Sequence, residues 1–460
     1  MYKKGRIIIT LVVVCMAVAL LIPQGLWAAG PKNVLYYIGD GTSTVQRRAP
    51  EEIFGRALIM NTLPILGLYT TYSTDSAITD SAAAGTALAC GMRTKNGVIS
   101  MDPMGRVAYE SIATAAKRMG KAVGLVTTSR LTHATPACFG SNVIQRNMEN
   151  EIAEQMVVTG FEVLMGGGLR NFVPQSVKGS KRKDDRDLTK EAAASGYDIA
   201  LTTDELMDVK IGKDTKVLGL FWGSHVPYYL DMPPEVPSLA DMTEVAINIL
   251  KQNPNGFFLM IEAARIDHAC HANDPAGAIG DTEDLDNAVK VGMTFLMDDP
   301  DTLIFVGGDH ECGGMALGIG KDYFLVPDVI LNCTKTFEWL SGEFSKNPDN
   351  ALALISEYAG ITDFTDEEIK AIEAAAAKVK AKAISPNTGS NPNWLGYVFS
   401  DIISKRARIG WTSYSHTAHP VMVTATGIGS ETFGGWYDIT DTGKKVADLW
   451  GITLRSWPVK

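Results

Sequence analysis

The sequence predicts an α/β fold, a three-layer α/β/α sandwich built around a large, mostly parallel central sheet. Four apolar runs do not alternate with polar residues, and helical stretches lie between them. An unbroken apolar run is typical of a strand that is buried on both faces, as in a parallel sheet. Strands that alternate with helices indicate a sheet covered by helices on both sides.

The expected elements follow in chain order. The strands are Asn33–Ile38, Ala122–Thr127, Phe257–Ile261 and Leu303–Val306, and the helices include Tyr109–Met119 and Ser238–Gln252. Between residues 320 and 410 the character of the chain changes, and Thr365 and Glu368 form a capping-box pattern that predicts the start of a helix. We therefore expect residues 320–410 to be an insertion that caps or borders the main sheet.

The composition is that of an ordinary globular protein. The chain has 460 residues, 46% of them hydrophobic and 20% charged, which excludes a disordered chain, a collagen-like fibre and a coiled-coil rod. Its 42 Lys and Arg against 52 Asp and Glu give a net charge of −10. This acidic balance argues against nucleic acid as a partner, because phosphate contacts need clustered Lys and Arg.

Residues 1–29 predict a secretory signal peptide. A basic start at Lys3, Lys4 and Arg6 precedes an uncharged run over Ile7–Ile22, and small residues follow at positions 28–30. The run is shorter than the roughly 20 residues of a spanning helix, although an uncleaved anchor is the alternative. No later segment is long and apolar enough to span a bilayer. We expect a periplasmic or secreted protein with no membrane contact after cleavage.

The sequence does not determine which cysteines form disulfides. Loss of the leader removes Cys15 and leaves five: Cys90, Cys138, Cys270, Cys312 and Cys333. An odd number means that at least one is unpaired within a single chain, although export permits disulfides. No Cys-x-x-Cys pair occurs, which argues against a thiolate zinc finger.

Metal-binding residue types follow each expected strand. In open α/β sheets, ligands bind at the carboxyl ends of the strands. The four clusters found there are Asp40, the run His133-Ala134-Thr135-Pro136, Glu262 together with Asp267-x-x-x-His271, and Asp309-His310. Each alone is more often a surface pair or a capped turn. Four such clusters, each just after a strand, instead predict a metal site at one edge of the sheet.

Two of these clusters have a specific geometry. Asp267 and His271 lie one helical turn apart, so both can bind one ion. Asp309 and His310 are adjacent and can share a metal only where the backbone is irregular, which the preceding Gly307-Gly308 permits.

A candidate nucleophile lies in the run Thr79-Asp80-Ser81-Ala82-Ala83-Ala84-Gly85. A serine at a helix start faces free backbone N–H groups and the positive end of the helix dipole, which favour a phosphate dianion. The alternative is an ordinary N-cap serine. A duplicate, Thr74-Asp75-Ser76-Ala77, lies just upstream.

Together these residues resemble the alkaline phosphatase family. The resemblance rests on Asp80-Ser81-Ala82 continued by Thr86 and Gly91, on Asp40, on His133-Ala134-Thr135-Pro136 with Arg146 thirteen residues after His133, on Met165-Gly166-Gly167-Gly168, on Gly256–His271, on Val306–His310 and on Trp411–Thr417. Ser76 lacks the continuation, so Ser81 corresponds to the nucleophile. These blocks span about residues 31–427, and residues 320–410 are the part they leave unanchored.

The resemblance implies an alkaline-phosphatase-like fold over residues 30–460, with a cap or crown insertion, and a three-metal site. One Zn2+ would bind Asp267, His271 and His416, and a second would bind Asp40, Asp309 and His310 beside Ser81. One Mg2+ would bind the other oxygen of Asp40 with Thr135 and Glu262. The residue types agree with these metals, because imidazole and carboxylate suit zinc and an all-oxygen set suits magnesium.

The resemblance also implies an activity, which is hydrolysis of phosphate monoesters to an alcohol and inorganic phosphate through a phosphoserine on Ser81. Arg146 would bind two phosphate oxygens as a fork. His133 and His268 would lie near the magnesium and the phosphate, acting through water. A homodimer is implied as well. His225 and His419 receive no role, and His419 is expected at the surface.

Two alternatives remain. A phosphodiesterase or sulfatase of the same superfamily is the first, although the Cys/Ser-x-Pro-x-Arg motif of sulfatases does not occur near Ser81. The second is a non-catalytic protein that binds phosphate or metal on the same fold.

Overall fold

The computed structural model describes residues 30–321, 323–383 and 394–459. The expected signal peptide at residues 1–29 lies outside the described residues. No helix within the described part of the chain is long and apolar enough to cross a membrane.

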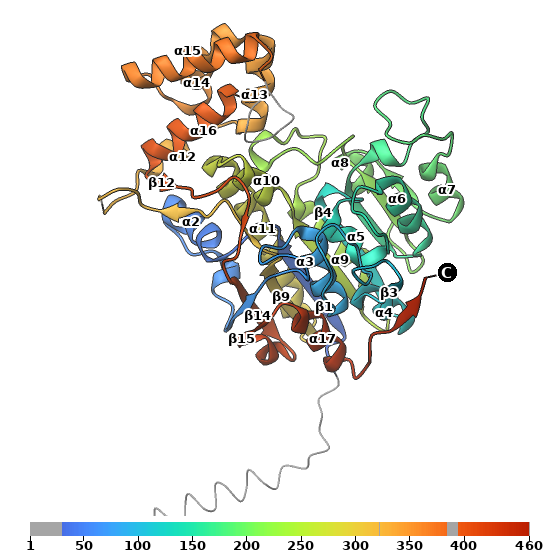
Figure 1. Ribbon diagram of the computed structural model, residues 1–460. Coiled ribbons are helices and arrows are strands. Elements are labelled where there is room, and N and C mark those ends of the chain that lie inside the picture. Colours follow the sequence, from blue (N-terminus) through green and yellow to red (C-terminus); the bar gives the residue numbers. More distant parts are fainter. Residues whose placement is uncertain (1–29, 322, 384–393, 460) are drawn as a thin grey trace, which may run out of the picture.

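The centre of the molecule is a ten-stranded sheet with the order β15-β2-β14-β9-β1-β8-β4-β5-β7-β6 (Figure 1). Its strands are β1 (Asn33–Gly39), β2 (Ile65–Thr70), β4 (Ala122–Arg130), β5 (Val163–Gly167), β6 (Asp198–Ala200), β7 (Val217–Leu220), β8 (Phe257–Ala263), β9 (Thr302–Gly308), β14 (Val421–Gly427) and β15 (Gly435–Asp438). β14 runs antiparallel to β9 and β2, and the other pairings are parallel. The prediction of a large, mostly parallel sheet is confirmed.

Helices bury both faces of this sheet. Along β1, Tyr36 and Ile38 belong to one hydrophobic core, whereas Leu35 and Tyr37 belong to another. The first core includes side chains of α3 (Ser81–Cys90), α4 (Ile112–Arg118), α5 (Ala134–Gly140), α6 (Glu149–Val158), α7 (Leu188–Ala194) and α17 (Thr440–Leu449). The second includes those of α8 (Thr203–Met207), α9 (Leu239–Leu250), α10 (Arg265–His271) and α11 (Pro275–Asp298). Because successive strand residues point to opposite faces, two cores mean three layers.

The four expected strands are all present, and each continues to at least the residue where it was predicted to end. The expected helix at Tyr109–Met119 begins later than predicted, because Tyr109 ends the short strand β3 (Val107–Tyr109) and pairs with β16 (Ser456–Pro458) near the carboxyl end of the chain. Ser111 then caps α4 by accepting a hydrogen bond from the Thr114 N–H. A partner distant in sequence gives no signal in the local pattern.

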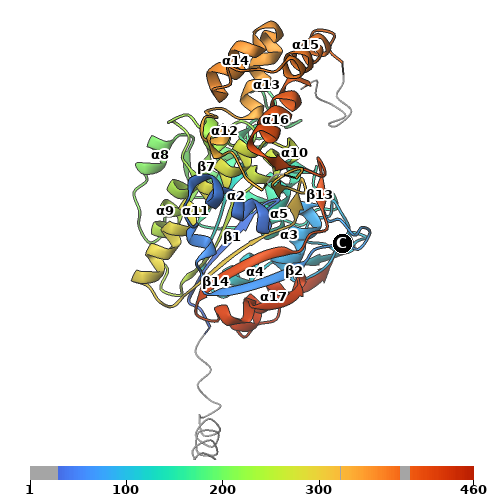
Figure 2. The same cartoon turned by 90° about the vertical axis from the view of Figure 1, so that its left-hand side faces the viewer.

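Five helices rise from one edge of the molecule between residues 327 and 407 (Figures 1 and 2). They are α12 (Pro327–Leu331), α13 (Phe337–Lys346), α14 (Ala351–Ala359), α15 (Asp366–Lys380) and α16 (Trp394–Ala407). Thr365 and Glu368 form the expected capping box at the start of α15. These helices share a third hydrophobic core with α2 (Thr44–Phe54), so they pack on the main body.

Two short ladders join the chain before these helices to the chain after them. β10 (Glu311–Cys312) pairs with β13 (His416–Thr417), and β11 (Ala316–Leu317) pairs with β12 (Ile409–Gly410). The first ladder places His416 beside residues that follow β9, more than a hundred positions earlier in the chain.

Candidate active site

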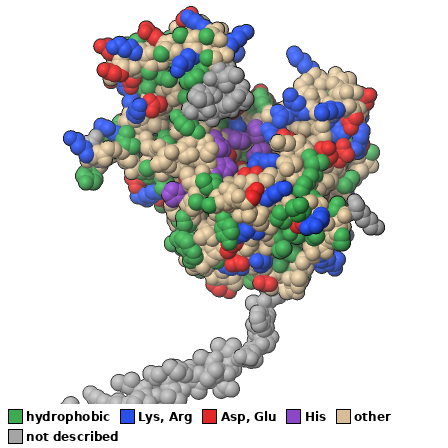
Figure 3. Space-filling model, in the orientation of Figure 1, with side chains coloured by type: hydrophobic (Ala, Val, Ile, Leu, Met, Phe, Trp, Pro, Cys, Tyr) green, Lys and Arg blue, Asp and Glu red, His purple; other side chains and the backbone are tan. Residues whose placement is uncertain are grey.

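The carboxyl ends of three neighbouring strands carry acidic residues of the site. In the order β9-β1-β8-β4, Gly39 lies opposite both Gly308 and Ala263. Asp40 and Asp309 therefore leave the sheet side by side, and Glu262 lies one residue before the end of β8. All three side chains are fully buried. Histidine side chains gather at the same place, in a hollow below the insertion (Figure 3).

The role expected for Gly307-Gly308 needs correction. Both residues lie within β9 and neither has a positive φ, so they supply no irregular backbone. A Cβ on Gly308 would lie 2.2 Å from the Thr42 carbonyl oxygen, and one on Gly307 would meet the Tyr69 hydroxyl at 2.8 Å. The glycines are needed because the neighbouring chain approaches closely, and Asp309 turns out of the sheet only after the strand has ended.

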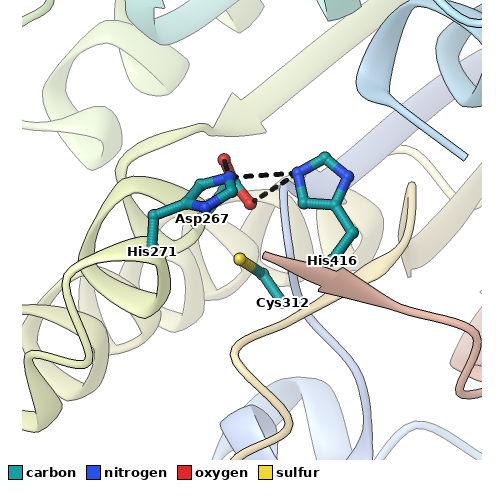
Figure 4. A group of neighbouring side chains, drawn as sticks. All are labelled: Asp267, His271, Cys312 and His416. Atoms are coloured by element: carbon teal, nitrogen blue, oxygen red, sulfur yellow. Dashed lines mark hydrogen bonds and ion pairs between the residues drawn. The ribbon is translucent and has the colours of Figure 1, made fainter. Parts of the chain in front are cut away.

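The first candidate metal group contains Asp267, His271 and His416 (Figure 4). His271 Nδ1 lies 2.7 Å from the Tyr414 carbonyl oxygen, and His416 Nδ1 lies 2.8 Å from that of Thr79. Each Nδ1–H therefore donates a hydrogen bond to a carbonyl oxygen, so the Nε2 atom of each ring has a lone pair free to bind a metal. The two Nε2 atoms face one another at 3.1 Å, and Asp267 oxygens lie 3.4 and 3.5 Å from them. Two lone pairs at this distance repel unless a cation lies between them.

The second group is Asp40, Asp309 and His310. His310 Nε2 lies 3.1 Å from Asp309 Oδ2 and 3.5 Å from Asp40 Oδ1. The N–H groups of Gly41 and His310 donate to Asp309 Oδ1, whereas Asp309 Oδ2 and both oxygens of Asp40 are buried without a hydrogen-bond partner. Burial lowers the pKa of His310, so its ring is neutral and able to bind a metal.

The third group joins Asp40 and Glu262 with a ring nitrogen of His133. Thr127 and Ser129 donate to Glu262 Oε2, and Oε1 is left buried without a partner. Thr135 Oγ1 is a further buried oxygen without a partner. Asp40 thus belongs to two groups, as expected for a carboxylate that bridges two ions.

The electrostatics of these groups fit bound cations. Burial raises the pKa of Asp309 to about 8 and that of Glu262 to about 7, and it raises the pKa of Asp40 as well, with neighbouring carboxylates adding to the shift at Asp309 and Asp40. Burial acts in the same direction on Asp267, but His271 and His416 hold its pKa below the usual range. Buried carboxylates with unpaired oxygens are costly unless a positive charge compensates them.

Ser81 is the first residue of α3, as expected. Asp80 is the N-cap, and its Oδ1 accepts a hydrogen bond from the Ala83 N–H. Ser81 Oγ lies 3.2 Å from His310 Nε2, next to the second metal group. The duplicate Ser76 lies outside any helix, and its hydroxyl accepts a hydrogen bond from the Ile78 N–H.

Arg146 contacts Asp80, the residue that precedes Ser81. Its Nη1 donates to Asp80 Oδ2 at 3.0 Å, and its Nη2 lies 3.1 Å from His133 Nε2. The guanidinium is therefore oriented by the residue that caps the helix of Ser81.

A cluster of three histidines flanks the third group. His133, His268 and His225 have ring centroids 4.4 to 5.6 Å apart, and burial lowers the pKa of all three. His225 was not predicted to belong here. It follows β7, a strand that was not among those expected, so the rule about strand ends would have found it once that strand was recognised.

His419 lies where it was expected, whereas Cys312 was not expected at the site. His419 is exposed, as expected, and lies near Glu311. Cys312 was not predicted at the site, yet its sulfur belongs to the first metal group. The five described cysteines are all free and buried, so none of them forms a disulfide.

A serine at a helix start, beside buried groups of metal-ligand type at the carboxyl edge of an α/β/α sheet, defines a metal-dependent hydrolase of phosphate esters. The chain belongs to the alkaline phosphatase family, which it matches over residues 31–452.

Similar proteins support this assignment. Alkaline phosphatase 4 of Bacillus subtilis is 36% identical over 425 residues, covering 89% of this chain and 87% of that protein. The repressible alkaline phosphatase of Saccharomyces cerevisiae is 31% identical over 483 residues, covering 92% and 82%. The crystal structure of Thermus thermophilus alkaline phosphatase has a TM-score of 0.82 at 31% identity and covers 95% of this chain and 97% of that chain. The protein is thus a phosphomonoester hydrolase.

Proposed function

We propose that this enzyme hydrolyses phosphate monoesters through a covalent phosphoserine on Ser81, with two Zn2+ and one Mg2+ per subunit. The observation that carries the proposal is the position of Ser81 Oγ at the N-terminus of α3, 3.2 Å from His310 in the second metal group.

The metal assignment follows the donor atoms. Asp267, His271 and His416 would hold one zinc, and Asp40, Asp309 and His310 the other. The oxygens of Asp40, Thr135 and Glu262 would hold magnesium, which prefers an all-oxygen set. Each group contains at least one buried oxygen without a hydrogen-bond partner, and this supports the fit.

Different residues of the chain bind the phosphate, attack phosphorus and act through water. The Arg146 guanidinium binds two oxygens of the substrate phosphate as a fork, and the free N–H groups at the start of α3 add to the attraction. Ser81 Oγ attacks phosphorus in line, the ester oxygen leaves as the alcohol, and Ser81 becomes phosphoserine. When bound, zinc would lower the pKa of the Ser81 hydroxyl and stabilise the charge on the leaving oxygen. Water then displaces Ser81 Oγ, inorganic phosphate leaves, and His133 and His268 act through water near these oxygens.

The substitution Ser81→Ala tests the nucleophile. We expect kcat for an aryl phosphate to fall by about 10³-fold or more, because no covalent intermediate can form. Ser76→Ala is the matched control and should keep wild-type activity, since Ser76 lies in the duplicate motif outside α3. Mass spectrometry of acid-quenched wild type should show a phosphate on the peptide that contains Ser81. Full activity in the Ser81 variant would refute the assignment.

Substrate class is tested by comparing kcat/KM for an aryl phosphate with that for its methyl diester. We expect the monoester to be faster, because Arg146 is placed to bind two free phosphate oxygens. A faster diester would make the enzyme a phosphodiesterase. If the metal-loaded protein hydrolyses neither substrate, a non-catalytic phosphate-binding role would be favoured.

Two further features are proposed from the family resemblance and the sequence. The first is a homodimer, which light scattering of the purified enzyme would show as twice the subunit mass. The second is export to the periplasm or the exterior through residues 1–29, which N-terminal sequencing of the exported enzyme would show as a start near residue 30.

A further inference from the structure

A thiol lies among the ligands of the first metal group. The Cys312 sulfur, a carboxylate oxygen of Asp267 and ring nitrogens of His271 and His416 all lie within 4.8 Å of one another (Figure 4). Cys312 is fully buried, and Asp267 Oδ1 is buried without a hydrogen-bond partner. Four donor atoms of metal-ligand type therefore lie close enough to one another to bind a single ion.

The backbone holds Cys312 at this place from three sides. In the β10–β13 ladder it lies directly opposite His416. Its N–H donates to the Gly41 carbonyl oxygen at 3.2 Å, and its own carbonyl oxygen accepts from Gln46 Nε2 at 3.0 Å. Gly41 follows Asp40, so the position of the thiol is tied to the same loop that supplies the second metal group.

The chemistry of the set matches a soft or borderline cation. Zinc binds imidazole nitrogen, carboxylate oxygen and thiolate sulfur, commonly with four ligands. Thiolate ligands favour zinc, cobalt and cadmium over magnesium. Binding would displace the thiol proton to solvent, as for any cysteine ligand.

We propose that Cys312 Sγ is a fourth protein ligand of the cation held by Asp267, His271 and His416. The inference rests on the metal centre of the proposed function and adds a sulfur ligand to it. This ligand makes the first site selective for thiophilic cations and leaves fewer positions open for oxygen ligands than a three-ligand site would have.

Cys270 provides a matched control. It is also fully buried and precedes His271 directly, yet its sulfur is not in the metal group. A Ser substitution at either position replaces sulfur with oxygen and keeps the shape of the side chain, so a difference between the two variants reports on coordination.

The test is cobalt substitution of the full-length enzyme after chelation. Wild type loaded with Co2+ should show visible d–d bands and, in addition, a near-ultraviolet charge-transfer band from sulfur to cobalt. The charge-transfer band should disappear in Cys312→Ser and remain in Cys270→Ser, while the d–d bands persist in both. Persistence of the charge-transfer band in Cys312→Ser would overturn the inference.

X-ray absorption at the zinc edge needs no variant. We expect the zinc-loaded wild type to show a sulfur shell at about 2.3 Å besides the nitrogen and oxygen shell at about 2.0–2.1 Å. A spectrum without sulfur would overturn the role of Cys312 and leave the proposed function intact. Failure to bind cobalt or zinc at all would instead refute the metal centre itself, so the two failures are distinguishable.

Discussion

Asp80 shows how one side chain positions two parts of the reaction. Its Oδ1 caps α3, while its Oδ2 accepts hydrogen bonds from the Gly97 N–H and from Arg146. The helix that carries Ser81 and the Arg146 guanidinium, proposed to bind phosphate, are therefore fixed to the same carboxylate. This link explains how a residue 65 positions away is aligned with the nucleophile.

Arg146→Lys should weaken phosphate binding. A lysine keeps the positive charge but cannot donate to Asp80 and hold two phosphate oxygens as a fork. Loss of one charge-assisted hydrogen bond costs about 1.5–3 kcal/mol, so we expect kcat/KM to fall by about 10- to 150-fold. Steady-state kinetics with an aryl phosphate measures this. Arg186→Lys, at an exposed ion pair with Glu191, is the control and should change nothing.

Gly41→Ala should remove metal from the first group. Gly41 has a φ of 70°, and a Cβ there would lie 2.7 Å from Asp267 Cα. Gly55 is the matched control, with a φ of 66° and nothing within 4 Å of its Cβ. Both variants should lose about 1 kcal/mol of stability through backbone strain.

Metal analysis and thermal melting separate the two effects. Gly55→Ala should keep the wild-type metal content with a slightly lower Tm. Gly41→Ala should lose metal as well, because Asp267 must move to make room. Equal metal content in both variants would mean that the contact at Asp267 is unimportant.

Some of the residues that the sequence predicted at the site directly follow a recognisable apolar strand. Asp40, Asp309 and His310 are of this kind. His225 was missed because β7, the strand that it follows, was not recognised. Cys312 could not be found in this way, because its position depends on the pairing of β13 with β10. Such contacts join segments far apart in sequence, and no local pattern encodes them.

At the scale of elements, α13 of the insertion is attached to the active site by its first turn. Glu338 Oε2 lies 2.8 Å from Arg265 Nη2, and Arg265 in turn donates to His268 Nδ1 and stacks on Tyr228. The Phe337 N–H donates to Asp274 at 2.9 Å. The insertion therefore contacts the histidine cluster through one buried arginine.

Glu338→Ala should loosen the insertion. Glu338 is mostly exposed, so the cost is about 1 kcal/mol or less, but Arg265 loses its acidic partner on α13. We expect faster proteolytic cleavage between residues 327 and 407 and a small fall in kcat/KM. Glu343→Ala, which removes an exposed pair with Lys346 on the same helix, is the control. Identical cleavage rates would show that the contact does not hold the insertion.

The elements themselves were predictable to different degrees. The buried strands and the capped helix α15 have strong local signals, namely an apolar run and a capping box. The two-residue strands β10 to β13 have none, because only their partners define them. The residue at which a strand ends was also hard to predict. The predicted ends were Ile261 and Val306, because Glu262 and Gly307 are residue types that are uncommon within strands, yet β8 and β9 continue past them.

For the whole molecule, the net charge of −10 conceals an uneven distribution. Four carboxylates lie buried within one site, at Asp40, Glu262, Asp267 and Asp309. Bound cations would reverse the local sign of charge, so an acidic protein can attract a phosphate anion. The same carboxylates make the metal-free fold sensitive to pH.

Metal-free enzyme should lose stability as the pH rises from 7 to 9. In the unfolded chain, Asp and Glu have pKa values of about 3.9 and 4.3. In the metal-free fold, burial raises the pKa of Asp309 to about 8 and that of Glu262 to about 7. Between these limits each of the two groups holds a proton in the folded state that it has released in the unfolded state, so each lowers the free energy of unfolding by up to about 1.4 kcal/mol per pH unit. The buried histidines, whose pKa burial lowers, act in the opposite direction, but only below their unfolded pKa of about 6.5, so the fall is expected above pH 7.

Thermal melting with and without metal measures this dependence. The Tm of chelator-treated enzyme should fall from pH 7 to pH 9 and level off above, whereas the metal-loaded enzyme should keep its Tm, since its carboxylates are ionised as ligands throughout. The stabilisation by metal should therefore grow with pH, as expected when binding releases protons. Asp309→Asn removes one of the groups, so the metal-free variant should show a shallower fall. A metal-free Tm that rises between pH 7 and pH 9 would contradict the assignment of these carboxylates as a buried, cation-dependent cluster.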